Sequence, residues 1–171
     1  MISIFEFGYR YLIPSIKRRL VEKLLEMGLT RNEIARRLNL SASTVSRYLS
    51  MERGHLINIV AYSDLDEAVG KLAQSLKNNP IDLYNVQIEI HRVAFYALSK
   101  GYMCKYHAKI DPTINPNKCP ICSMLFQTET TKNAAENVKA YAKKPPQIMG
   151  GSLMNTRVAK ECSNANLTNE G

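Results

Sequence analysis

Four side chains in the C-terminal half have the types and spacing of metal ligands. In the stretch CKYHAKIDPTINPNKCPIC, two residues separate Cys104 from His107, and two residues separate Cys119 from Cys122. Two short-spaced ligand pairs joined by a loop are typical of tetrahedral zinc sites. The pattern therefore predicts a Cys3His metal site that holds together a small knuckle, residues 102–126.

Two other interpretations of the same four residues stay open. Three cysteines and one histidine can also hold an iron–sulfur cluster, so this cofactor is the alternative to zinc. The thiols can instead be unligated, with Cys119 and Cys122 as a redox-sensitive pair. Cys162 is expected to be a free thiol, and it is the candidate fourth ligand if His107 is not one. A metal here would either stabilise the fold or sense metal or redox state.

A second group of residues has the pattern of a helix-turn-helix. Thr30 and Glu33 are spaced as a capping box, which starts a helix. Ser41 is a good N-cap for a following helix that ends near Leu49. Asn39 stands between them, where the chain must turn with a positive φ, a conformation that asparagine tolerates. The sequence therefore predicts two short helices joined by a tight turn.

The second helix of this motif carries small hydroxyl-bearing residues where a surface helix usually carries Lys and Glu. In a helix-turn-helix, this helix enters the DNA major groove by its N-terminal end, and small side chains permit the close approach. The predicted base contacts are Ser43, Thr44 and Arg47, the arginine because its guanidinium can pair with guanine. The predicted DNA backbone contacts are Arg31, Arg36, Arg37, Ser41, Arg53 and His55.

The charge distribution agrees with an anionic partner. The net charge is +8, and residues 1–60 carry ten Lys or Arg against five Asp or Glu. The alternative is a protein- or RNA-interaction module that uses the same basic surface. No Gly-rich phosphate loop, nucleophile elbow or paired carboxylates are recognisable, so we expect no enzyme. No apolar run is long enough for a membrane span, and we expect a cytoplasmic protein.

The stretch YLIPSIKRRLVEKLLEMGLTRNEIARRLNLSASTVSRYLSMERG resembles the N-terminal domain of a family of archaeal predicted transcriptional regulators. These have a lambda-repressor-like (XRE-type) helix-turn-helix, which also occurs fused to archaeal thiamine-phosphate synthase domains. The resemblance rests on Tyr11-Leu12-Ile13-Pro14, Glu33-Ile34-Ala35, Val45-Ser46, Tyr48-Leu49-Ser50 and Arg53-Gly54. It implies sequence-specific binding to double-stranded DNA as a dimer, and family members often carry a Cys/His set. No synthase domain is expected after residue 126.

The predicted fold is all-α. We expect a helix-turn-helix domain at 1–56, a helical packing or dimerisation region at 57–101, the knuckle at 102–126, and a helix followed by a disordered tail at 127–171. The first helix is expected to start at Pro14. The middle region should hold one helix with a buried stripe of Leu65, Val69, Leu72 and Leu76. A second, longer helix should have Ile81, Tyr84, Ile88, Phe95 and Leu98 among its apolar positions. Near-neutral charge and broad apolar stripes favour a homodimer through these helices, the alternative being packing on the helix-turn-helix.

Overall fold

The computed structural model describes residues 1–78 and 82–126, and every regular element in these ranges is helical. The elements are α1 (Ile4–Phe7), the π-helical segment η1 (Gly8–Leu12), α2 (Ile13–Glu26), α3 (Arg31–Arg37), α4 (Ala42–Leu49), the 3-10 turn η2 (Ile59–Ala61), α5 (Ser63–Asn78), α6 (Leu83–Ser99), α7 (Cys104–Ile110) and α8 (Ile121–Phe126). For these residues the all-α prediction is confirmed. Ile81, the predicted helix at 130–142, the tail and Cys162 lie outside the described residues.

The N-terminal helix is longer than the sequence predicts. The chain is helical from Ile4 through α1, η1 and α2, so the predicted start at Pro14 is wrong. Proline lacks the amide proton that a helix interior uses and crowds the preceding turn, and the wider π-helical turn of η1 comes just before it. The Ser15 hydroxyl donates to the Tyr11 carbonyl oxygen at 2.8 Å, which gives one carbonyl of this irregular turn a partner.

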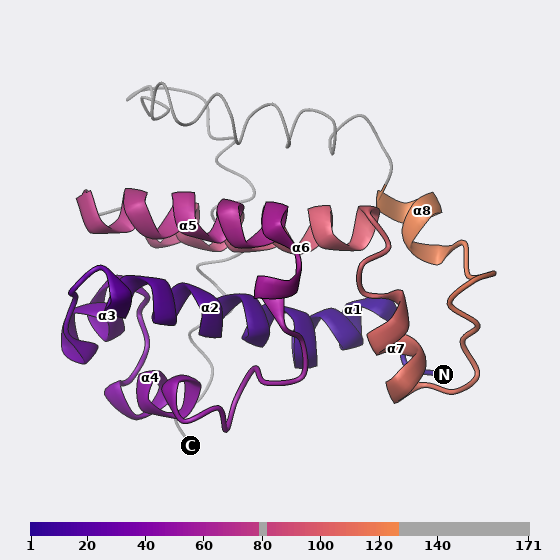
Figure 1. Ribbon diagram of the computed structural model, residues 1–171, viewed down its shortest axis with the longest axis horizontal. Helices are drawn as coiled ribbons and strands as arrows, with labels where there is room; N and C mark the ends of the chain where they lie inside the picture. Colours follow the sequence, from indigo (N-terminus) through magenta and orange to yellow (C-terminus); the bar gives the residue numbers. More distant parts are fainter. Residues whose placement is uncertain (79–81, 127–171) are drawn as a thin grey trace, which may run out of the picture.

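Helix α2 forms the centre of the molecule. Its side chains Ile16, Leu20, Val21 and Leu24 are fully buried. In Figure 1, α5 and α6 run along one side of α2, α4 lies on the other, and α3 lies at the end of α2. The helix-turn-helix is therefore packed onto a helical support, and its own two short helices do not have to form a core alone.

Ion pairs tie α2 to α5. Asp66 accepts hydrogen bonds from Arg19 at 2.6 Å and from Lys23 at 2.8 Å. Burial acts to raise the pKa of Asp66, but these two cations outweigh burial and lower it. Arg18 likewise pairs with Glu22, also on α2. Three of the ten basic residues before position 61 are thus neutralised inside the fold, and the basic surface is smaller than the sequence count suggests.

Most of the apolar positions named for α6 lie on the side of that helix that faces away from the core. Tyr84, Ile88 and Phe95 are 79%, 46% and 43% exposed, and only Leu98 of the described stripe is buried. The core instead takes Val86, Ile90, Val93, Ala94, Ala97 and Leu98. The helix carries two apolar stripes, and periodicity alone does not say which of them faces the core. The stripe predicted for α5 is confirmed, since all four of its residues are buried.

The segment after α4 is held against α2 by Gly54. This glycine has a φ of +73°, and a Cβ added to it would lie 2.4 Å from the carbonyl oxygen of Pro14. The Arg18 side chain donates from Nε to the Gly54 carbonyl oxygen at 2.9 Å. Ile57 and Ile59 are then fully buried, so the segment between α4 and α5 forms part of the core.

Replacing Gly54 by alanine should therefore destabilise the protein. The added methyl group cannot coexist with the Pro14 carbonyl, and the left-handed backbone is strained for alanine, so we expect a loss of about 2–4 kcal/mol in the free energy of unfolding. Urea denaturation followed by circular dichroism measures it. Gly8→Ala is the matched control, since nothing lies within 4 Å of its added Cβ. Gly8 is helical and should change by less than about 1 kcal/mol, in the stabilising direction. Equal stability of the two variants would contradict the packing described for Gly54.

Candidate nucleic-acid interface

The helix-turn-helix has the caps and turn that its sequence predicts. The Thr30 hydroxyl accepts from the Glu33 amide, and the Glu33 carboxylate accepts from the Thr30 amide at 2.8 Å, which completes the capping box. Asn39 has a φ of +50°, and the Leu40 amide behind it donates to the Ala35 carbonyl oxygen at 2.8 Å. The turn therefore depends on the one residue type other than glycine that most readily takes this conformation.

The two helices of the motif meet through small and apolar side chains. Ile34 and Ala35 of α3 and Val45 and Tyr48 of α4 are buried. The exposed face of α4 begins at Ser41, whose hydroxyl accepts from the Thr44 amide at 3.1 Å. The same hydroxyl lies 2.9 Å from that of Ser43 and 2.8 Å from that of Thr44. The N-terminal end of α4 thus presents a small, hydroxyl-rich surface with no long side chain among these residues.

Arg47, the third predicted base contact, is 59% exposed on α4. Its Nε lies 3.5 Å from a carboxylate oxygen of Glu52, which follows the helix. An ion pair between two exposed side chains is weak in water. The Arg47 guanidinium can therefore leave Glu52 and bind a base edge with little loss of free energy from the broken ion pair.

The predicted backbone contacts divide into two kinds. Arg31, Arg36, Arg53 and His55 are exposed and accessible to a phosphate. Arg37 has another role, because it donates to the carbonyl oxygen of Leu76, and to that of Lys77 at 3.4 Å, at the C-terminal end of α5. A cation stabilises such an end because helix carbonyls there lack partners. Arg37 thus makes a packing contact with α5, and its DNA contact stays a prediction.

Lys17 is a candidate contact that the sequence analysis did not select. Burial lowers the pKa of Lys17, and the nearby Arg53 guanidinium lowers it further. Two neighbouring cations on this surface gain from a shared anion such as a phosphate. Their proximity depends on the fold, because Lys17 is on α2 and Arg53 follows α4, so local sequence patterns did not indicate it.

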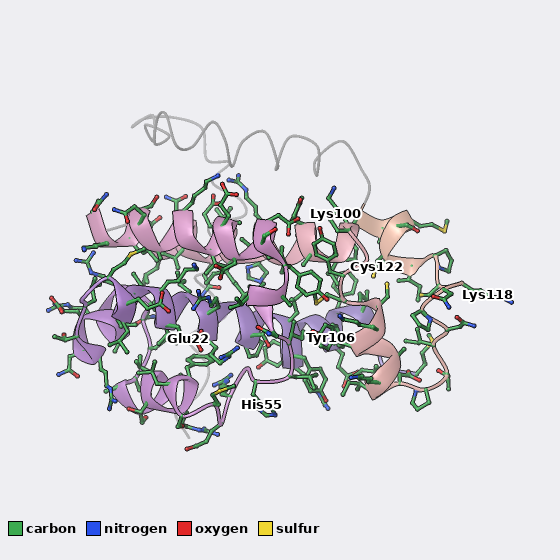
Figure 2. All side chains as sticks on the ribbon, viewed as in Figure 1. Glu22, His55, Lys100, Tyr106, Lys118 and Cys122 are labelled. Atoms are coloured by element: carbon green, nitrogen blue, oxygen red, sulfur yellow. The ribbon has the colours of Figure 1, made fainter. Side chains whose placement is uncertain are left out.

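The three cysteines of the predicted knuckle come together at the other end of the molecule. Cys104 is on α7, Cys122 on α8, and Cys119 in the loop between them; Figure 2 shows Cys122 where α7 and α8 meet. Burial, together with the neighbouring Cys104 and Cys119, raises the pKa of Cys122 to about 12. Burial and Cys119 likewise raise the pKa of Cys104. Without a cation, Cys104 and Cys122 stay protonated at neutral pH and are poor nucleophiles.

The fourth predicted ligand faces the N-terminal helix. The His107 ring is buried and packs against Phe7 in a tilted arrangement, with ring centroids 4.9 Å apart. Its Nε2 lies 3.0 Å from the Ile2 carbonyl oxygen. Within residues 1–78 and 82–126, no group of three or more His, Cys, Asp or Glu side chains is arranged to hold a metal ion. The three thiols thus lie near one another, but the four side chains of the predicted Cys3His site are not arranged around one point in the described part of the chain.

The cysteine region and the turn before it are anchored to the rest of the fold by two carboxylates, Asp111 and Asp64. The Ile2 amide donates to the Asp111 carboxylate at 2.5 Å, and the Thr113 hydroxyl and this amide lower the pKa of Asp111 to about 2. On the other side, the hydroxyls of Tyr96 and Tyr102 each donate to Asp64 at 2.8 Å. The continuous N-terminal helix, made of α1, η1 and α2, thus contacts α7 through its first residues and contacts α4 through α2.

Comparison with known proteins identifies the N-terminal motif. Residues 26–51 match the family of winged helix-turn-helix DNA-binding domains. The match begins at the end of α2 and stops just after α4, so it covers α3, the turn and α4 but no segment that could form a wing. Neither the curated proteins nor the solved structures gave a match to this chain. Among the helices that the structure describes, none is long and apolar enough to cross a membrane. The chain therefore carries a helix-turn-helix DNA-binding domain, as expected of a DNA-binding regulator.

Proposed function

We propose that this protein is a cytoplasmic transcriptional regulator that binds an operator in double-stranded DNA as a homodimer. The observation that carries the proposal is the exposed, small-residue N-terminal end of α4, held by a capped helix-turn-helix. Regulation would follow from occupancy of the operator, and no catalysed reaction is part of the proposal.

In the proposed complex, α4 lies in the major groove with its N-terminal end leading. Ser43, Thr44 and Arg47 reach base edges, where the arginine can pair with guanine. The backbone contacts come from Arg31, Arg36, Ser41, Arg53, His55 and Lys17. These residues surround α4 and need no rearrangement of the core.

The relation to XRE-type archaeal regulators, and through them to thiamine-phosphate synthase fusions, is supported by the sequence resemblance alone. The family matched at residues 26–51 is of the winged type. In either type of helix-turn-helix the second helix of the motif reads the DNA. The proposed contacts therefore do not depend on which type this domain is.

We also propose a metal site at the cysteine region, with structural zinc preferred and an iron–sulfur cluster as the alternative. Its support is the ligand spacing and the proximity of the three thiols, whose protons a cation would displace. His107 can serve as fourth ligand through Nδ1 if Nε2 donates to the Ile2 carbonyl, an arrangement usual for metal-bound histidine. Cys162 is the other candidate and lies outside the described residues. The site would either stabilise this end of the fold or sense metal or redox state.

Arg47 should determine part of the base preference. After selection of an operator from random duplexes, Arg47→Ala should weaken binding to the selected site by roughly 1–3 kcal/mol and relax preference at one position. Fluorescence anisotropy at several salt concentrations measures it. An equal loss on random duplex would show that Arg47 contacts only phosphate. Failure of the wild-type protein to prefer any duplex would favour the interaction-module alternative, which RNA binding would test.

Arg36 and Arg37 are neighbours that should affect different properties. Arg36→Ala should leave the free energy of unfolding unchanged and reduce the salt dependence of DNA binding by about one unit of slope. Arg37→Ala should instead lower the free energy of unfolding by about 1–2 kcal/mol, because the carbonyl oxygens at the end of α5 lose their cation. Each variant serves as control for the other in urea denaturation and DNA titration. The reverse assignment would show that Arg37 contacts DNA.

Elemental analysis of protein purified without air tests the metal proposal. We expect one zinc per chain, with its loss and a lower melting temperature in Cys119→Ser. Visible absorption together with iron would identify the cluster alternative. His107→Gln and Cys162→Ser serve as paired variants, since only the one that removes the fourth ligand should lower the metal content. Metal-free wild-type protein would end the metal proposal without affecting the DNA-binding one.

A further inference from the structure

Helix α6 carries an apolar stripe that the described part of the chain leaves exposed. Tyr84, Ile88, His91 and Phe95 follow one another at steps of four, three and four residues. This is the spacing of the a and d positions of a coiled coil, which form a single seam along a helix. All four side chains are exposed, while the core-facing stripe of the same helix lies on its opposite side.

The exposed seam belongs to a larger apolar surface. Leu83 on α6 and Met124 and Leu125 on α8 are also exposed. The Phe95 ring stacks on Phe126 of α8 with centroids 5.5 Å apart, which fixes its position at the end of the seam. An apolar surface of this kind usually marks an interaction site.

We infer that this seam is where two copies of the chain pair, with their α6 helices antiparallel. The a and d positions of antiparallel helices meet in alternation, which places Tyr84 opposite Phe95 of the second copy and Ile88 opposite His91. The arrangement is self-complementary, as a two-fold symmetric dimer requires. The inference deepens the proposed function by naming the surface that makes the regulator a dimer.

A second copy of the chain needs a contact face with little charge, because two chains of net charge +8 repel each other over most of their surfaces. Beside the seam, Asn85 and Gln87 are neutral, and Glu89 pairs with Arg92 at 2.6 Å. This face therefore offers no complementary charge to a strongly acidic or basic partner and little repulsion to an identical chain. Antiparallel helices also align their dipoles favourably.

The position of α6 is compatible with DNA binding. Figure 1 shows α6 on the opposite side of α2 from α4. Pairing through α6 therefore leaves the N-terminal end of α4 uncovered.

Sedimentation equilibrium of the full chain, in the absence of DNA, tests the inference. Wild-type protein should be a dimer, and Ile88→Glu should weaken association by about 100-fold or more, because the symmetric interface buries the added carboxylate twice. Tyr84→Glu is a second seam variant at a position so exposed that folding should not suffer. Gln74→Glu adds the same charge on the exposed face of α5 and should remain dimeric. Circular dichroism confirms that all variants fold.

The outcomes separate this inference from the proposed function. A monomeric wild-type protein, or an Ile88→Glu variant that stays dimeric, overturns the α6 pairing, even if DNA binding persists. The seam would then be covered by something else, such as residues 127–171 or a different protein. A dimer that dissociates on Ile88→Glu supports the pairing, even if the wild-type protein shows no preference for any duplex.

Discussion

Helix α2 has to bury apolar side chains toward the helix-turn-helix and toward α5 and α6 at the same time, and the rest of the structure depends on this double burial. An α3–α4 pair of this length contains too little apolar surface to fold by itself. Packed against α2, it gains a rigid base, and the close contact of Gly54 with Pro14 fixes the chain where it leaves α4. The orientation of the DNA-facing surface is thus a property of the whole helical support.

Ion pairs then determine which charges remain for a nucleic acid. Arg18, Arg19 and Lys23 are used between or along helices, and Arg37 is used at the end of α5. Among the basic residues before position 61, the exposed Arg31, Arg36, Arg47 and Arg53 lie on or beside α3 and α4, while the exposed Arg10 lies on η1. Because Arg18, Arg19 and Lys23 are paired on α2, the helix-turn-helix holds most of the accessible positive charge of this N-terminal part.

The two candidate sites share one continuous element. The N-terminal helix contacts His107 and Asp111 near its start and packs on α4 along α2, with the π-helical turn between them. A change at the cysteine region would reach the DNA-binding end by shifting this helix. If the metal site senses metal or redox state, this helix is the physical connection to the DNA-binding end. If the site is structural, the same contacts only stabilise the fold.

The sequence by itself determined the elements whose signals are local. The capping box at Thr30, the turn at Asn39 and the cap at Ser41 each depend on residues within four positions of one another. The interactions that form them can therefore be recognised in the local sequence. Only the tertiary structure decided which of two apolar stripes on α6 is buried, that Arg37 contacts α5, that His107 faces Phe7, and that Lys17 lies near Arg53. These outcomes depend on contacts between helices far apart in the chain. Several faces of each helix could be buried, and packing against the other helices determines which one is. A single helix's periodicity contains no information about that choice.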